Sequence, residues 1–263
     1  MDPATDPAMD PAMNDATSRV AELTAALAGL RARLARAAEA AGRPVEDIEL
    51  LPVTKFFPAS DVAILWRLGC RAFGESRAQE AAAKVVEVQR LLDSPPGGGP
   101  RWHMIGGVQR NKARAVADWA HTVHSVDSPK IAAALGAAAA EGLDAGRRSA
   151  PLEVFVQVSL DGDPDRGGVD IGDPAAVDRL CALIAEQPAL VLAGLMAIAP
   201  LGADPDAAFA ALAREHRRVL ASHPGARGLS AGMSGDLEAA VRHGSTCVRV
   251  GAALLGERPL TSP

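Results

Sequence analysis

The sequence Leu50-Leu51-Pro52-Val53-Thr54-Lys55 is a short apolar run that ends in a basic residue. An apolar run without alternation is typical of a parallel strand that is covered on both faces. Phe56-Phe57-Pro58 ends this strand, since proline has no N–H to donate and restricts the residue before it. The sequence therefore predicts that Lys55 lies at the carboxyl end of a buried strand, beside apolar aromatic residues.

Lys55 has two interpretations on this stretch alone. Burial disfavours the charged form of an amine and leaves more of it as a free nucleophile, which a Schiff-base lysine requires. The alternative is a strand-end lysine whose aliphatic stem covers apolar surface while its ammonium group stays in water. Other parts of the chain have to distinguish the two.

Further apolar runs alternate with helical patterns along the chain. Beside the first strand, strands are expected at residues 71–75, 102–106, 122–126, 152–159, 192–198, 227–231 and 247–250. Such alternation predicts parallel strands with helical crossovers, and eight units in 263 residues match the size of a (β/α)8 TIM barrel. An open doubly wound sheet is the alternative, but the G-x-G-x-x-G turn that it would want after an early strand is absent.

The N-terminal part contains two different patterns. Residues 1–16 repeat Asp-Pro-Ala, have little to bury and are expected to be a disordered tail. From Thr17 onward, apolar residues at three- and four-residue steps mark one face of a long helix: Val20, Leu23, Leu27, Leu30 and Leu34. We expect this helix to pack on the barrel, because its heptads are too few for a coiled coil. The expected organisation is a tail over 1–16 and, over 17–263, a single-domain α/β barrel with an additional N-terminal helix.

Composition narrows the function classes. The chain is 48% hydrophobic and 22% charged, which is ordinary for a globular protein with a substantial core. A net charge of −5 gives no reason to expect nucleic acid or anionic lipid as a partner. Three scattered cysteines without metal-ligand spacing indicate reduced thiols and no metal site. With no signal-peptide pattern and no apolar run of membrane length, we expect a cytoplasmic protein.

Two glycine-containing segments follow the last two expected strands. The carboxyl ends of barrel strands build the active site, and phosphate commonly binds after the seventh and eighth strands. Gly232-Met233-Ser234-Gly235-Asp236 offers a close backbone approach, a hydroxyl group and the free N–H groups of a helix start. Gly251 follows the eighth strand. Either segment alone is equally consistent with a tight turn and a helix cap.

Arg249 interrupts the apolar run of the last strand. Arginine is almost never buried without a partner, so it points either into the barrel mouth or outward to a helix carboxylate. In a closed barrel the first and last strands are neighbours, which brings Lys55 and Arg249 together. A lysine, an arginine and an anion cradle predict a pocket for pyridoxal 5′-phosphate (PLP), with PLP as an aldimine on Lys55 and the arginine donating to the pyridine nitrogen. His103, on the third expected strand, is interpreted as structural.

A set of short motifs stands in a characteristic order along the chain. They are Val53-Thr54-Lys55, Phe73-Gly74-Glu75, Trp102-His103-Met104-Ile105-Gly106, Gln109-Arg110-Asn111-Lys112, His124-Ser125-Val126-Asp127, Gly194-Leu195-Met196-Ala197-Ile198, Gly232-Met233-Ser234-Gly235-Asp236 and Val248-Arg249-Val250-Gly251. From about Thr17 to Pro259 the chain closely resembles the YggS/PROSC-type pyridoxal phosphate homeostasis proteins. The resemblance implies a barrel like the N-terminal domain of alanine racemase.

The resemblance also implies roles for individual residues. PLP is on Lys55, Arg249 faces the pyridine nitrogen, and the remaining cofactor contacts come from Ser76, Met196, Gly232, Met233, Ser234 and Gly251. Ser234 and Gly251, with neighbouring backbone, would hold the phosphate, and the two methionines would pack around the cofactor. Ser76 stands where the family usually has an asparagine near the cofactor.

Catalysis is a separate question. Racemase relatives use a second acid/base on the opposite face of PLP, a tyrosine from a C-terminal β-domain of the partner subunit. This sequence has no tyrosine and continues only briefly past the eighth expected strand. We therefore expect a PLP-binding protein of intracellular PLP and amino/keto acid homeostasis, without dedicated catalysis or a catalytic residue. PLP-dependent apoenzymes are its expected partners, and it is expected to be a monomer or weak dimer. The alternatives are a low-activity PLP-dependent amino-acid racemase and a cofactor-free scaffold that binds a protein partner.

Overall fold

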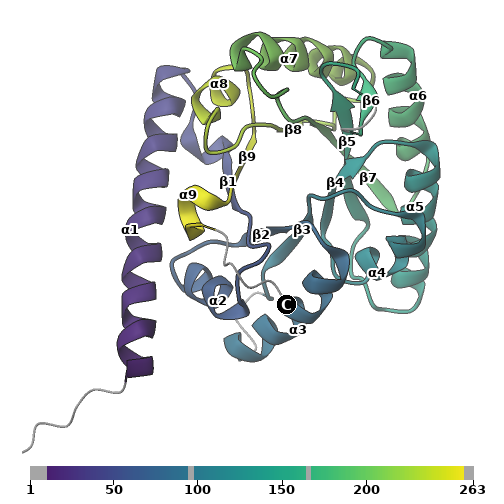
Figure 1. Ribbon diagram of the computed structural model, residues 1–263. Helices are drawn as coiled ribbons and strands as arrows, with labels where there is room; N and C mark the ends of the chain where they lie inside the picture. The colour runs from purple at the N-terminus through teal and green to yellow at the C-terminus, as the bar shows by residue number, and fades with distance from the viewer. Residues whose placement is uncertain (1–10, 94–97, 164–166, 258–263) are drawn as a thin grey trace, which may run out of the picture.

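The structure is a computed structural model that describes residues 11–93, 98–163 and 167–257, and the side chains from residue 17 onward. Its strands form one ring of parallel ladders in the order β1-β9-β8-β7-β5-β4-β3-β2 (Figure 1). The strands are β1 (Glu49–Pro52), β2 (Ala72–Glu75), β3 (Arg101–Met104), β4 (Thr122–Val126), β5 (Leu152–Ser159), β6 (Val169–Asp170), β7 (Leu190–Met196), β8 (Gly228–Ser230) and β9 (Cys247–Val250). The two-residue strand β6 lies off this ring and pairs with β5.

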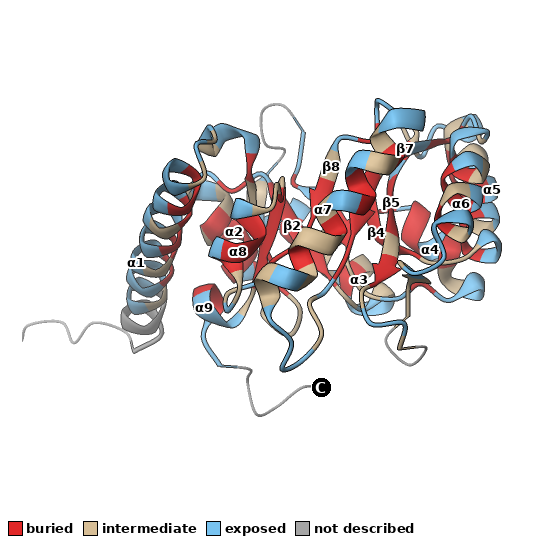
Figure 2. Ribbon diagram, turned by 90° about the horizontal axis from the view of Figure 1, so that it is seen from above, coloured by how far each residue is buried: buried red, intermediate tan, exposed pale blue. Residues whose placement is uncertain are grey.

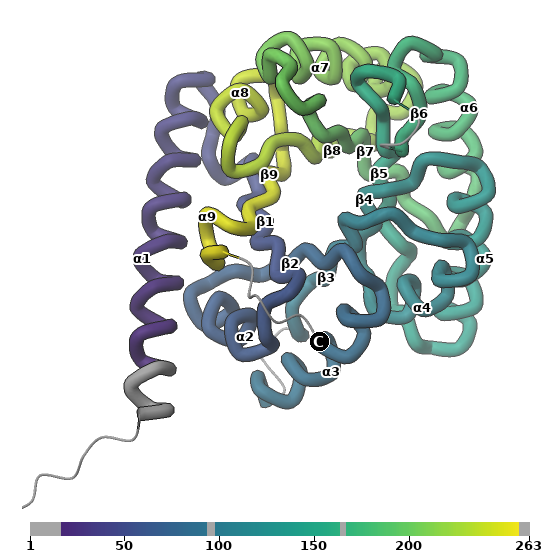
Figure 3. Tube along the Cα trace, viewed as in Figure 1, coloured from purple at the N-terminus to yellow at the C-terminus, as the bar shows by residue number. Residues whose placement is uncertain are grey.

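The ring closes between β1 and β2 just beyond the end of β1. Val53 and Gly74 form a parallel bridge there, and the Thr54 N–H donates to the Gly74 carbonyl oxygen at 2.9 Å. On the other side of β1, Leu51 is the register partner of Arg249 on β9. First and last strands are therefore neighbours, as Figure 3 shows along the chain trace. The predicted (β/α)8 barrel is confirmed.

Helices alternate with the strands and cover the outside of the ring. They are α1 (Pro11–Ala40), α2 (Ala59–Arg67), α3 (Ala78–Leu92), α4 (Ala113–Ala117), α5 (Pro129–Asp144), α6 (Pro174–Ala185), α7 (Pro205–Ser222), α8 (Leu237–Arg242) and α9 (Ala252–Leu255), with 3-10 turns η1 (Val45–Asp47) and η2 (Arg110–Lys112). Between β3 and β4 the chain forms the 3-10 turn η2 followed by the short helix α4. Within the described residues, no helix combines the length and apolarity that crossing a membrane requires.

The N-terminal helix α1 lies along one side of the barrel, against α8, α9 and α2 (Figures 1 and 2). Four of the five predicted apolar positions are buried against the barrel: Leu23, Leu27, Leu30 and Leu34. Val20 is 42% exposed and lies at the edge of this stripe. The helix begins at Pro11, before Thr17, where its apolar pattern starts. Residues 1–10 of that expected tail lie outside the described residues.

Candidate functional site

Lys55 comes shortly after β1, beyond Val53 and Thr54, at the carboxyl end of the barrel, close to where the strand prediction placed it. It is partly buried, and its Nζ atom lies 5.8 Å from the centroid of the Phe56 ring. Phe56 has a φ of 70°, a left-handed conformation that costs a bulky residue of the order of 1–3 kcal/mol and tends to occur at functional sites. The Lys55 amine makes no hydrogen bond or ion pair with any residue that the structure describes, so it is available to react.

A buried ion pair holds the backbone beside Lys55. The Thr54 hydroxyl donates to Glu75 Oε1 at 2.7 Å, and Lys84 Nζ on α3 donates to the same oxygen at 2.7 Å. The same ammonium group also donates to the Thr54 carbonyl oxygen at 2.7 Å. Glu75 is completely buried, and its Oε2 atom has no hydrogen-bond partner among the described residues. These contacts connect the end of β1 to β2 and α3, and no pattern within the sequence predicted them.

Arg249 on β9 is 5% exposed, and burial lowers the pKa of its guanidinium. It donates from Nη1 to Ser230 Oγ at 2.6 Å and from Nη2 to the Ala197 carbonyl oxygen at 3.0 Å. Ser230 Oγ also contacts His124 Nδ1 at 2.8 Å, although β8 and β4 are not neighbours in the sheet. Side chains of non-neighbouring strands meet only across the barrel interior, so Arg249 points inward. The alternative of an outward-facing arginine is excluded.

The charge of Arg249 lacks a counter-ion. Within the described part of the chain, no carboxylate forms an ion pair with this guanidinium. A buried cation with only neutral protein partners carries a desolvation cost that an acceptor or anion would offset. The guanidinium has five donor hydrogens, and its two hydrogen bonds to the protein leave several for a bound group.

Two buried histidines continue the polar chain that starts at Arg249. His124 Nε2 lies 2.9 Å from His103 Nδ1, and the His124 ring stacks on Phe155 at 4.5 Å between centroids. Burial lowers the pKa of His103 to about 3 and that of His124 well below its usual value, so both rings are neutral at pH 7. If Arg249 donates to Ser230, then Ser230 donates to His124 and His124 donates to His103. The His103 Nε2 atom has no hydrogen-bond partner among the described residues.

The loop after β8 depends on a glycine. Gly232 has a φ of +89°, and a Cβ atom there would lie 2.5 Å from the Ala240 Cβ atom, so another residue would be strained and crowded. Its carbonyl oxygen accepts the Arg249 backbone N–H at 3.0 Å. Met233 is 41% exposed, and Ser234 is partly buried with a hydroxyl that forms no hydrogen bond to the described residues. A hydroxyl without a protein partner is open to a ligand.

The remaining predicted cofactor contacts, Met196, Gly251 and Ser76, lie on different elements of the barrel. Met196 ends β7, is buried, and is the register partner of Ser230. A Cβ atom on Gly251 would lie 3.8 Å from the Val53 carbonyl oxygen, which places this glycine beside β1. Ser76 instead lines a cavity of about 390 Å³ with Arg77, which precedes α3, and Lys112 of η2. Arg249 connects directly to Gly232 and, through Ser230, to the end of β7 at Met196.

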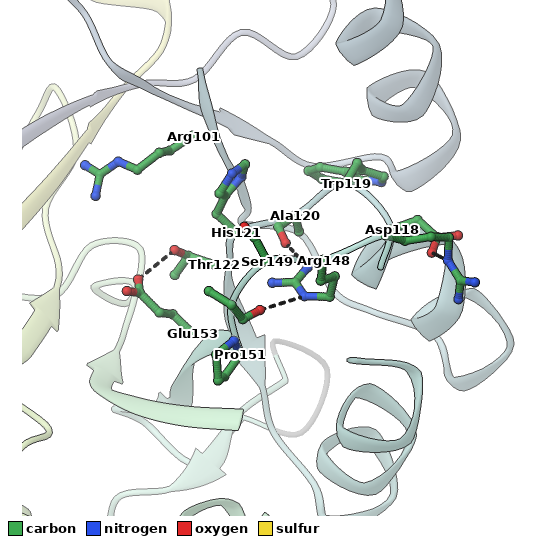
Figure 4. Close-up of a pocket in the computed structure, with 12 residues that line it drawn as sticks. Arg101, Asp118, Trp119, Ala120, His121, Thr122, Arg148, Ser149, Pro151 and Glu153 are labelled. Atoms are coloured by element: carbon green, nitrogen blue, oxygen red, sulfur yellow. Dashed lines mark hydrogen bonds and ion pairs between the residues drawn. The ribbon is translucent and has the colours of Figure 1, made fainter. Parts of the chain in front are cut away.

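A separate hollow of about 190 Å³ lies at the opposite end of the barrel (Figure 4). Its wall includes Arg101, Thr122 and Glu153, which stand at or near the amino ends of β3, β4 and β5. Its Arg148 already donates from Nη1 to the carbonyl oxygens of Ala117 and Ala120, each at 2.6 Å. Barrels of this kind place their chemistry at the carboxyl ends of the strands, so this hollow is not the candidate site.

Comparison with known proteins agrees with this barrel. Residues 26–259 match the family model described as alanine racemase, N-terminal domain. The alanine racemase of Corynebacterium glutamicum shares the fold, with a TM-score of 0.60 and 18% identity over 88% of this chain and 60% of that one. Fold and site therefore define a barrel of the alanine racemase N-terminal-domain type.

More similar relatives narrow the class. A protein of Mycobacterium tuberculosis named pyridoxal phosphate homeostasis protein is 62% identical over 248 residues, which cover 93% of this chain and 96% of that relative. The structure of PipY from Synechococcus elongatus PCC7942 with PLP bound has a TM-score of 0.71 and 30% identity, and covers 89% of this chain and 100% of PipY. This chain belongs to the family of pyridoxal phosphate homeostasis proteins.

Proposed function

We propose that this protein binds PLP through Lys55 and serves the homeostasis of PLP and of amino and keto acids, without dedicated catalysis. The observation that carries the proposal is the buried Arg249, which points into the barrel interior without a counter-ion. It stands on β9, the strand that pairs with β1, and Lys55 with its unpaired amine comes shortly after β1. The M. tuberculosis relative supports the homeostasis role by its name, and the PLP-bound PipY structure supports the cofactor.

The residues present fit the chemistry of this cofactor. The Lys55 amine would condense with the PLP aldehyde, forming a C=N bond and releasing one water molecule. Arg249 stays protonated at neutral pH and would donate to the pyridine nitrogen, which keeps that nitrogen unprotonated and the ring a weak electron sink. Ser234, Gly232 and Gly251 would surround the phosphate, as proposed from the sequence. We further propose Met196 and Met233 as contacts of the ring, and Ser76 as a peripheral contact.

The site arrangement favours holding PLP over turning over a substrate. A neutral pyridine nitrogen weakens carbanion stabilisation, and none of the 263 residues is a tyrosine that could act as the second acid/base. We propose that PLP-dependent apoenzymes receive the cofactor and that the protein acts as a monomer or weak dimer. Slow amino-acid racemisation is the second candidate function, since a lysine without a protein partner after the first strand of a racemase-type barrel favours it.

Absorbance spectroscopy tests the proposal directly. Purified protein with added PLP should show the visible band of a Schiff base, and borohydride reduction should leave the label on the peptide that contains Lys55. The band should disappear in Lys55→Ala and persist in the control Lys130→Ala, because Lys130 is an exposed residue of α5. Retention of the band in Lys55→Ala, or a protein that stays colourless, would refute the proposal, the latter in favour of a cofactor-free scaffold. Robust α-proton exchange of alanine in deuterated water, well above that of Lys55→Ala, would instead support the racemase.

A further inference from the structure

Helix α1 makes a polar contact with the loop after β8. Arg33 on α1 donates from Nη1 to the Ser234 carbonyl oxygen at 2.7 Å. The other two nitrogens of the same guanidinium hold Glu238, with Nε 2.5 Å from Oε1 and Nη2 2.6 Å from Oε2. A two-point contact of this kind fixes the plane of the guanidinium. The direction in which Nη1 points is therefore set by Glu238, and the Ser234 carbonyl lies where it points.

This contact fixes the orientation of a peptide group in the loop. In a trans peptide the carbonyl oxygen and the following N–H point in opposite directions, and no peptide bond of the described residues is cis. With the Ser234 oxygen held by α1 on the outside of the barrel, the Gly235 N–H must point away from α1. That N–H donates no hydrogen bond within the described residues, and neither does the Ser234 hydroxyl.

Without the contact, the loop would have little to hold it. Gly235 has no side chain and is exposed, and a Cβ atom there would meet nothing within 4 Å. A glycine peptide rotates more freely than any other, so turning its N–H toward one direction costs conformational entropy. Arg33 removes that freedom before a ligand arrives.

We propose that Arg33, held by Glu238, is a positioning residue that turns the 234–235 peptide toward the phosphate group of the cofactor. The inference rests on the proposed PLP function. It gives the N-terminal helix a role in specificity for the phosphate group, and this role does not require the helix to contact the cofactor ring. It predicts that Arg33 matters for PLP and not for pyridoxal, which has the same aldehyde and ring but lacks the phosphate.

The test compares the affinities for PLP and pyridoxal in each variant, followed by the visible absorbance of the Schiff base. Arg33→Ala should lower the preference for PLP over pyridoxal by about tenfold, the size expected for a lost charge-assisted hydrogen bond. Glu238→Gln should lower it less, because the amide can still hold one nitrogen of Arg33. Arg31→Ala is the matched control: it lies on the same helix, donates to the Leu68 carbonyl oxygen instead, and should leave the preference unchanged.

The ratio of the PLP affinity to the pyridoxal affinity distinguishes a positioning role of Arg33 from a general contribution to the stability of the fold. If Arg33→Ala weakens PLP and pyridoxal equally, or changes neither, Arg33 does not position a phosphate contact and the inference is wrong. If the unmodified protein binds PLP no better than pyridoxal, the phosphate role of the loop also fails. If the unmodified protein forms no Schiff base with either aldehyde, the proposed function fails, and the missing visible band distinguishes this result from a failure of the Arg33 inference alone.

Discussion

The buried pair His103–His124 makes the stability of this protein depend on pH, and His103→Gln isolates the effect. Native His103 stays neutral down to a pKa of about 3, whereas the unfolded chain takes up a proton near the ordinary value of 6.5. The unfolded state therefore binds more protons at acidic pH, and acid favours unfolding. The stabilisation is fully present above about pH 6.5 and is lost as the pH falls from there toward 3.

The magnitude follows from proton linkage. Between pH 7 and pH 5 the binding polynomial of an unfolded histidine, which is one plus the ratio of its protonated to its neutral form, rises by about 25-fold. That of native His103 hardly changes over the same range. This rise corresponds to a loss of about 2 kcal/mol in the free energy of unfolding. Glutamine cannot titrate, and its side-chain oxygen can still accept the hydrogen bond from His124 Nε2. The variant keeps most of the contact and loses the part of the pH dependence that His103 contributes, while His124 remains in both proteins.

Urea unfolding of both proteins at several pH values measures this contribution. The free-energy difference between the wild-type protein and His103→Gln should narrow by about 2 kcal/mol from pH 7 to pH 5. From pH 7.5 to pH 8.5 it should stay constant, since the histidine is neutral in both states there. A difference that is the same at pH 5 and pH 7 would mean that native His103 can be protonated, and would refute the neutral hydrogen-bond chain.

The Lys84–Glu75 ion pair and two buried cysteines give further predictions. Lys84→Met leaves the Glu75 carboxylate buried without its cation and should lower the free energy of unfolding, measured in urea, by about 3–5 kcal/mol. Adding Glu75→Gln to the same chain should recover part of this loss, because it removes the unpaired charge. A loss below about 0.5 kcal/mol in Lys84→Met would contradict the buried pair. Burial raises the pKa of the Cys181 and Cys247 thiols to about 12, so both should react with a thiol-specific disulfide reagent only after unfolding. Stoichiometric labelling of the native protein within seconds would show that they are accessible.

Much of the site was predictable because it follows strand ends. Lys55 ends an apolar run and Arg249 interrupts one, and both features are visible in a single sequence. The chain from Arg249 through Ser230 to His124 and His103 was not predictable, because its members lie up to about 150 residues apart and contact each other across the barrel. Polar residues inside apolar strands were the signal that could have indicated it.

The periodicity of apolar residues was sufficient for the barrel and its N-terminal helix, because local backbone geometry dictates which residues of a strand or helix share a buried face. Closure of the ring decided the rest. It brought β9 beside β1, turned Arg249 inward without a counter-ion, and placed Arg33 on α1 against the Ser234 loop. Contacts of this kind depend on the relative positions of whole elements in three dimensions, and no pattern within one stretch of the chain records them.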